Sequence, residues 1–342
     1  MRKSLLFLSI FLGSAVFSSL QAQDPQFSQF YAAPLYLNPA FAGSSGQSRA
    51  GVNFRAQWPS LDANFTTVSA YFDHYFEDYN SGVGVIVTGD REGISGLQSI
   101  NVGLQYSYQL QIAEWLIFRP GAEVAFYNRD LNFDNLVFGD QLDQNGLIGA
   151  PTGETLNTGL SRSFVDLSLG GLFYNENFFI GYAAHHVNTP NQSLVEEESR
   201  LSMKHSVHGG YRFLLPTGFQ KFGYNKDGKE RSITPTFQYK RQGNFDQLDV
   251  GAYLTYEPIV FGMWYRGLPV SQLRDLPNHE SVIALVGFVF NDLNVGYSYD
   301  YTVSGLGIRS GGAHEISVAY HFSLRDPRKP PRSMMRLPCP KF

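Results

Sequence analysis

The chain has 342 residues, of which 16% are charged and 15% are aromatic, and its formal net charge is −4. The sequence shows no nucleic-acid-binding pattern, because the basic residues near its C-terminus are not interleaved with aromatic residues on which bases could stack. A single cysteine, Cys339, excludes an internal disulfide, and no apolar run beyond the N-terminus is long enough for a membrane-spanning helix.

Residues 1–22 have the features of a secretory signal peptide. Arg2 and Lys3 precede an apolar run from Leu5 to Phe17, and mostly small or polar residues follow it up to Ala22. This order predicts export of the chain and cleavage after Ala22. An uncleaved anchor helix is the alternative, but the apolar run is short and ends in polar small residues.

Residues 23–48 form an irregular segment that is rich in Phe and Tyr. The segment does not alternate between apolar and polar residues, and it contains Pro25, Pro34 and Pro39. Because proline lacks a backbone donor and fixes φ, we predict that this stretch is neither a central strand nor a helix. So many aromatic side chains are unfavourable in water, which leaves two places for them: the interior of the domain that follows, or a partner protein.

The same segment resembles a known family. It reads QDPQFSQFY and then, after a short gap, LNPAFAG, which resembles the N-terminus of the PorP/SprF family of Bacteroidetes. The resemblance implies an outer-membrane β-barrel associated with type IX secretion and gliding motility. The residues that we expect to bind a partner or to plug the barrel are Phe27, Phe30, Tyr31, Asn38, Pro39 and Phe41.

Residues 99–112 show the pattern that recurs along the rest of the chain. Ile100, Val102, Leu104 and Tyr106 fall on one face of an extended strand, and only small or polar residues fall on the other. A strand of this kind, about 9–11 residues or longer, can cross a bilayer at a tilt. The pattern therefore indicates a membrane β-barrel with its apolar face toward lipid.

Fourteen stretches have this pattern, and bacterial barrels contain an even number of strands. They are residues 49–58, 63–74, 82–88, 99–112, 116–127, 164–174, 178–187, 204–214, 232–240, 247–256, 259–266, 281–290, 293–302 and 314–324. We therefore predict an all-β fold, a transmembrane antiparallel up-and-down β-barrel of fourteen strands over residues 49–324, located in the outer membrane.

The connections between these strands differ in length. Short ones at 113–115, 175–177, 257–258 and 291–292 alternate with longer ones at 89–98, 128–163, 188–203 and 267–280, as expected for periplasmic turns and external loops. Two connections break the rule, since 59–62 is short and 215–231 is long. The second is either a periplasmic excursion or an external loop that follows a missed register. The aspartates of 128–163 lack the spacing of an EF-type calcium loop, which favours a solvated loop.

Residues 325–342 form a basic, proline-rich tail. Six basic residues stand against one acidic residue, and Pro330 and Pro331 favour an extended polyproline conformation. The end of the tail also looks like a family ending. We expect the tail to dock to a periplasmic partner or cargo, and a free disordered end is the alternative. The residues expected to make this contact are Arg328, Lys329, Arg332, Arg336, Leu337, Pro338, Cys339 and Phe342.

Catalytic motifs are missing from the sequence. It contains no G-x-S-x-G, no H-E-x-x-H and no cysteine pair, and His314 and Glu315 fall on opposite faces of one predicted strand. We therefore expect no enzyme activity, no cofactor and no metal site.

The resemblance implies a function in secretion. It points to a non-enzymatic barrel that supports secretion, anchoring or surface display of type IX cargo, such as gliding-adhesin-type partners, through protein–protein contacts. The expected partners are secreted type IX cargo, periplasmic or outer-membrane secretion and gliding proteins, and outer-membrane lipid, but no nucleic acid. The barrel pattern alone fits an alternative, a passive outer-membrane porin or hydrophobic-solute channel.

Overall fold

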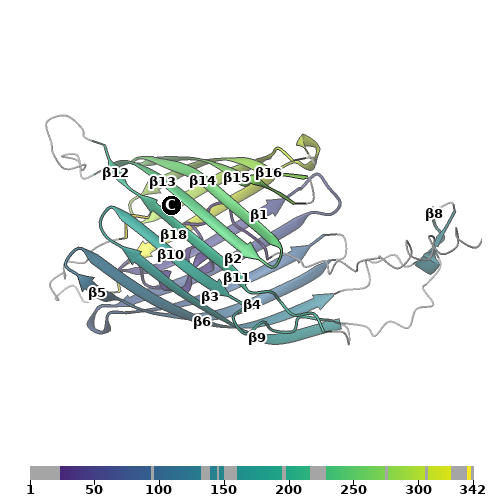
Figure 1. The fold of residues 1–342 in the computed structure, drawn as a ribbon, viewed down its shortest axis with the longest axis horizontal. Helices are drawn as coiled ribbons and strands as arrows, with labels where there is room; N and C mark the ends of the chain where they lie inside the picture. Colours follow the sequence, from purple (N-terminus) through teal and green to yellow (C-terminus); the bar gives the residue numbers. More distant parts are fainter. Residues whose placement is uncertain are drawn as a thin grey trace, which may run out of the picture.

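The computed structural model describes residues 24–93, 96–131, 139–144, 146–149, 160–194, 198–215, 229–273, 276–304, 307–324 and 337–339. The predicted signal peptide lies outside these residues. Over the described part of the chain the fold is a closed barrel of fourteen antiparallel strands, which confirms the predicted fold (Figure 1). Each of the fourteen stretches predicted from alternation corresponds to one strand of the barrel wall.

Two of the wall strands are interrupted by one residue, so that they carry two labels each. β5 continues β4 and also pairs with β6, and β12 continues β11 and also pairs with β13. The wall consists of β1 (Ser48–Gln57), β2 (Phe65–Phe76), β3 (Ser81–Glu92), β4 (Leu97–Tyr108), β5 (Leu110–Ala113), β6 (Leu116–Leu131), β9 (Leu160–Tyr174), β10 (Phe178–His185), β11 (Lys204–Tyr211), β12 (Phe213–Leu214), β13 (Arg231–Gln242), β14 (Phe245–Tyr256), β15 (Ile259–Leu273), β16 (Leu276–Phe290), β17 (Leu293–Thr302) and β18 (Ala313–Phe322).

Consecutive strands are neighbours around the whole barrel. The ring closes where β1 pairs with β18, with Ser48 opposite Phe322 and Gln57 opposite Ala313. β1 therefore begins, and β18 ends, at the end of the barrel that also carries the turns at 114–115, 175–177, 257–258 and 291–292. In barrels of this kind that end faces the periplasm and the opposite end faces the outside. The two ends are called the periplasmic and the extracellular end below.

The predicted facing of the strands is confirmed. On β4 the side chains of Ile100, Val102 and Leu104 are 55%, 43% and 62% exposed, whereas those of Gln105 and Ser107 are 2% and 0% exposed. This arrangement is the reverse of that in a water-soluble domain, because the outer surface of the barrel meets lipid rather than water. Polar side chains consequently face the interior.

Replacing Val102 by arginine is expected to cost about 2–4 kcal/mol of stability, because the charge would enter the apolar band near the middle of a membrane strand. Asn101→Arg on the same strand should cost far less, because Asn101 lines an interior cavity beside Glu123. The free energies of unfolding of the two variants are compared by urea unfolding in lipid, with the folded fraction measured from heat-modifiable migration on a gel. Equal losses for both would contradict the facing of β4.

Two of the predicted loops are largely strand. β3 continues to Glu92 and β4 begins at Leu97, while β15 continues to Leu273 and β16 begins at Leu276. Backbone pairing extends these hairpins beyond the stretches in which apolar and polar residues alternate in the sequence. Apolar alternation therefore marks the lipid-facing part of a strand and misses its extension.

The ambiguous connection at 215–231 lies at the periplasmic end. β12 ends at Leu214 and β13 begins at Arg231, and both belong to an unbroken antiparallel series with no missed strand. This strand pairing makes the connection at 215–231 a periplasmic excursion and excludes an external loop. Residues 216–228 of this connection lie outside the described residues.

The helices are short, and two of them lie in residues 23–48, where the prediction of no helix was wrong because proline is tolerated at the first position of a helix. They are α2 (Pro34–Leu37), η1 (Pro39–Phe41), η2 (Glu77–Tyr79), η4 (Gly139–Gln141) and η5 (Ile308–Ser310), and a small hairpin of β7 (Leu142–Asp143) and β8 (Gly146–Leu147) lies in the connection from β6 to β9. Within the described residues, no helix is both long and apolar enough to cross a membrane. α2 and η1 belong to residues 24–46, which form the hydrophobic core together with inward-facing wall residues. We call residues 24–46 the lumenal segment.

Candidate functional site

The lumenal segment runs through the barrel from the extracellular to the periplasmic end. Asp24 contacts His186, which follows the extracellular end of β10, and Lys204, which begins β11. At the other end Gly43 donates its backbone N–H to Asp73 of β2, just before β1 begins at the periplasmic end. All residues from 27 to 44 except Tyr36 are buried. The irregular aromatic stretch therefore lies in the interior of the barrel.

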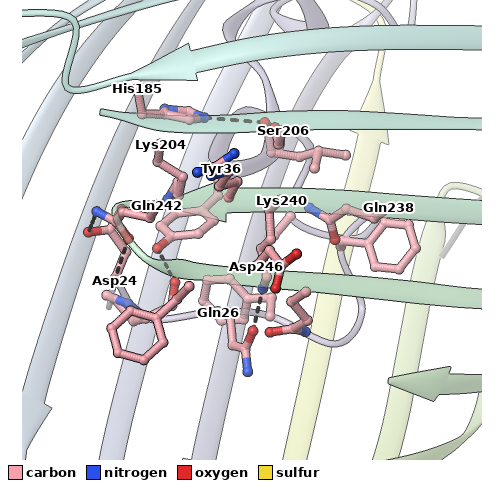
Figure 2. A pocket seen from close by; sticks show the side chains of 18 residues that line it. Asp24, Gln26, Tyr36, His185, Lys204, Ser206, Gln238, Lys240, Gln242 and Asp246 are labelled. Atoms are coloured by element: carbon pink, nitrogen blue, oxygen red, sulfur yellow. Dashed lines mark hydrogen bonds and ion pairs between the residues drawn. The ribbon is translucent and has the colours of Figure 1, made fainter. Parts of the chain in front are cut away.

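Asp24 anchors the extracellular end of the segment (Figure 2). One carboxylate oxygen lies 2.8 Å from His186 Nε2 and 2.6 Å from Lys204 Nζ, and the other accepts a hydrogen bond of 3.0 Å from the Gln242 side chain. Burial works to raise the pKa of Asp24, but the charges of His186 and Lys204 outweigh it and hold the pKa well below its usual range. Burial works to lower the pKa of His186, and the charge of Asp24 reverses this and raises it to about 9. Both groups are therefore charged near neutral pH.

Ser28 and Gln29 bind a cluster of charged side chains on the wall. The backbone N–H groups of these two residues donate to the two oxygens of Glu315, at 2.7 and 2.9 Å. The Ser28 hydroxyl donates to Asp300 at 2.5 Å and accepts from Arg55 at 2.7 Å. A carboxylate that accepts two consecutive backbone N–H groups fixes the direction of the chain, so the segment has one register in the lumen.

A second arginine completes this cluster. Arg266 is fully buried, donates to Asp249 at 3.3 Å and to Asp300 at 3.0 Å, and also donates to the Ser28 hydroxyl at 2.8 Å. Arg55 in turn lies 2.9 Å from Asp300. The wall cluster thus comprises Arg55, Asp249, Arg266, Asp300 and Glu315, from five different strands. Two arginines balance most of the carboxylate charge, which is the condition under which charges are buried at tolerable cost.

The aromatic side chains of the segment fill the lumen between the wall strands. Phe30 packs edge-on against Trp264 of β15, and Tyr31 packs edge-on against Phe179 of β10 with ring centroids 5.2 Å apart. Phe41 stacks on His208 of β11. These contacts bury the aromatic rings of the segment against other side chains and away from water.

Asn38 and Pro39 turn the chain between the two short helices. The Asn38 side chain accepts a hydrogen bond from the backbone N–H of Ala40 and donates to the carbonyl oxygens of Gly171 and Tyr182 on the wall. Pro39 occupies the first position of η1, where a missing N–H costs nothing. The Asn-Pro pair therefore caps a helix and attaches it to β9 and β10.

Glycines on the wall allow the backbone of the segment to come close. A Cβ on Gly82 would lie 2.0 Å from the carbonyl oxygen of Ala42, and a Cβ on Gly121 would lie 2.4 Å from the backbone nitrogen of Ala40. Both contacts are with backbone, which cannot move aside as a flexible side chain does. Gly82 and Gly121 thus shape the wall to fit the segment.

The structure places the predicted N-terminal site residues inside the barrel. Phe27, Phe30, Tyr31, Asn38 and Phe41 are between 0% and 4% exposed. Pro39 is buried as well. In this position they lie within the barrel, next to its wall.

Sequence reasoning did not find the wall residues that receive the segment. Arg55, Asp249, Arg266, Asp300 and Glu315 lie on strands with their side chains buried in the interior. A charge at such a position is expensive without a partner, so a charged residue on the inward face of a strand is the signal that identifies this cluster.

The tail residues fall into two groups. Leu337 and Cys339 line a cavity at the periplasmic end and pack against the hydrophobic core, and Pro338 between them is buried. Arg328, Lys329, Arg332, Arg336 and Phe342 lie outside the described residues. Among the side chains that the structure describes, no group of three or more His, Cys, Asp or Glu is arranged to hold a metal ion.

The comparison with family models decides which family the chain belongs to. The model for "Type IX secretion system membrane protein PorP/SprF" matches residues 19–320. The chain is a member of the PorP/SprF family. The matched range contains the whole lumenal segment and nearly all of the wall, and it ends before residues 325–342. The comparison with curated proteins gave no match.

Three solved structures are similar to this PorP/SprF protein at low sequence identity. The Ralstonia pickettii toluene transporter TbuX is 11% identical, with a TM-score of 0.50, over 85% of this chain and 94% of that one. The P. putida toluene transporter TodX is 10% identical, with a TM-score of 0.47, over 84% and 93% of the two chains. The Acinetobacter baumannii outer membrane protein Omp33 is 10% identical, with a TM-score of 0.43, over 82% and 100%.

The family and the fold together locate the protein. It is a type IX secretion system membrane protein whose barrel matches those of outer-membrane proteins, so the PorP/SprF protein resides in the outer membrane. Its family belongs to the type IX secretion system, and membership implies partners in the secretion machinery.

Proposed function

We propose that this protein is a non-enzymatic scaffold in the outer membrane. It supports secretion, anchoring or surface display of type IX cargo, including gliding-adhesin-type partners, through protein–protein contacts, while the lumenal segment acts as a permanent plug. Family membership supports the link to secretion. The packing of the lumenal segment supports a scaffold rather than an open channel.

One observation carries the proposal: the lumenal segment contacts every one of the fourteen wall strands. The wall partners, in order around the barrel, are Arg55 of β1, Asp73 of β2, Gly82 of β3, Ser107 of β4, Gly121 of β6, Gly171 of β9, Phe179 of β10, Gly209 of β11, Lys240 of β13, Tyr253 of β14, Arg266 of β15, Glu280 of β16, Asp300 of β17 and Glu315 of β18. A segment held from all sides obstructs the lumen.

Withdrawal of the segment would be costly. A hydrogen bond to a charged group contributes about 1.5–3 kcal/mol, and Ser28 and Gln29 alone make several of them. Withdrawal would also expose the buried rings of Phe30, Tyr31 and Phe41 to water. The segment therefore stays seated during function, and partners bind at the two ends of the barrel.

A disulfide between the segment and the wall tests this proposal. A Cβ on Gly84 of β3 would lie 3.4 Å from the Cβ of Ala42, close to the spacing of about 3.5–4.5 Å in disulfides. The variant Ala42→Cys/Gly84→Cys is made in a Cys339→Ser background, which leaves no other thiol. Cells that carry this variant are expected to display as much cargo as cells that carry Cys339→Ser alone. This should hold both when the disulfide is formed and after a reductant has cleaved it.

The control pair is Ala42→Cys/Gly89→Cys. A Cβ on Gly89 has no heavy atom within 4 Å, so this pair cannot cross-link. Loss of display in the oxidised Ala42→Cys/Gly84→Cys protein, with recovery on reduction, would show that the segment must move and would overturn the scaffold. Normal display in cells that lack the protein altogether would overturn the role in secretion.

The alternative function is a passive porin or hydrophobic-solute channel. The shared fold with a toluene transporter motivates it, although at 11% identity that likeness extends to the fold alone. A channel requires the lumenal segment to leave a path for solute. This alternative would be favoured if cells that lack the protein still display cargo on their surface and the purified wild-type barrel conducts ions.

A further inference from the structure

We propose that the periplasmic mouth of the barrel is a binding site for an extended apolar peptide, and that its occupant is the chain's own C-terminal stretch, residues 337–339. The site lies at the periplasmic end, where Leu337 and Cys339 form part of the wall of a cavity of about 650 Å³. It is bounded by the lumenal segment on one side and by the turns after β14 and β16 on the other. We call it the periplasmic cavity.

The walls of the periplasmic cavity come from three parts of the chain. Tyr31 and Phe41 belong to the lumenal segment, Pro258 and Val289 belong to the barrel, and the tail contributes its own residues. Leu337 and Cys339 pack against the same hydrophobic cluster that includes Tyr31 and Phe41. The tail thus covers the periplasmic end of the lumenal segment.

The chemistry of residues 337–339 fits this site. None of the three carries a charge, and the central residue, Pro338, is buried and has no N–H that would need a partner. Burial of Leu337 and Pro338 against apolar side chains removes them from water, which is favourable. Burial also raises the pKa of the Cys339 thiol well above its ordinary value, against the opposing charge of Arg49, so the thiol stays neutral at the site.

The position of the tail differs from the role expected from its sequence. A tail that docks to a periplasmic partner exposes Leu337, Pro338 and Cys339 to that partner, whereas here these residues lie in the mouth of their own barrel. A partner can therefore reach them only after they leave the cavity. The inference goes beyond the proposed function, which holds whether the cavity is occupied or empty.

Cys339 is the only cysteine and reports directly on the occupancy of the cavity. The full-length protein is reacted with a maleimide–polyethylene glycol reagent in proteoliposomes, and the labelling rate is measured. Leu337→Asp should release the tail and raise this rate by about tenfold or more, since tenfold corresponds to about 1.4 kcal/mol. Labelling of wild-type Cys339 should be slow relative to the same protein unfolded in guanidinium.

Leu324→Asp is the matched control. Leu324 is 63% exposed just after β18 and does not line the periplasmic cavity, so the same chemical change there should leave the rate unaltered. Heat-modifiable migration verifies that each variant retains the barrel. Wild-type labelling as fast as in guanidinium, or equal rates for Leu337→Asp and Leu324→Asp, would overturn the proposal.

A second measurement uses the tail in trans. A fluorescent peptide of residues 325–342 should bind to the protein truncated after Leu324, and the Leu337→Asp peptide should bind at least about tenfold more weakly. Failure of the wild-type peptide to bind would contradict the site, even if secretion of cargo proceeds as proposed. The scaffold function and the tail site therefore fail separately.

Discussion

Replacing Arg266 by methionine is expected to lower the free energy of unfolding by about 3–5 kcal/mol, the range observed when one partner of a buried ion pair is removed. Arg266 is fully buried, and its loss leaves Asp249 without its arginine and Asp300 with only Arg55. The Ser28 hydroxyl also loses a donor, so the lumenal segment is held less firmly. Urea unfolding in lipid, followed by tryptophan fluorescence, measures the loss.

Arg200→Met is the control for this prediction. Arg200 pairs with Glu198, but these side chains are 64% and 60% exposed. Water screens such a pair, so its removal should cost about 0–1 kcal/mol. If the two arginine variants lose the same stability, the buried cluster does not hold the segment in the way that its geometry indicates.

Removing the lumenal segment is expected to turn a closed barrel into a conducting one. Barrels of 8 strands are filled by side chains and those of 16–18 leave an aqueous channel, so a barrel of fourteen strands without its segment should leave a path for ions. Single-channel conductance in planar bilayers should rise several-fold in a variant that lacks residues 24–46. The wild-type protein should conduct little.

A point substitution tests the same idea in a full-length chain. Gly82→Val should displace the segment, because its Cβ would meet the backbone of Ala42, and conductance should rise. Gly89→Val lies on the same strand, where a Cβ has no neighbour within 4 Å, and should conduct like the wild type. If the wild-type protein conducts strongly, or if Gly82→Val and Gly89→Val have the same conductance, the lumenal segment does not plug the barrel.

Much of the wall could be predicted from the sequence, because lipid on the outside demands unbroken apolar alternation. Ile100, Val102 and Leu104 satisfy this demand on β4, and small polar residues face inward. The extensions of β15 and β16 beyond the membrane were missed. There the strands are held by backbone pairing, which does not require apolar and polar residues to alternate in the sequence.

The sequence predicted one half of the site, the N-terminal segment, but not the wall residues that contact it. Aromatic residues and prolines marked residues 23–48 as a segment that needs a surface to lie against, and the motif placed them in a family. Their wall partners could not be predicted, because Ser28 and Glu315 are 287 positions apart and meet only when the barrel closes. The tail was expected to dock to a partner through its charges and through Leu337, Pro338 and Cys339. The sequence could not show that Leu337 and Cys339 lie in the mouth of their own barrel, because that mouth is built from strands distant in the chain.

The course of the lumenal segment has a consequence for biogenesis. Its residues precede β1 in the chain, yet they bind Glu315 on β18, the strand that closes the ring against β1. Once that seam forms, every backbone edge of the ring is paired, and the segment could enter only by threading lengthwise past its own contacts. We therefore expect the later strands to assemble around the N-terminal segment. Pairing of β1 with β18 and packing of the segment in the interior should then occur in one slow step, because both depend on contacts between residues far apart in the chain.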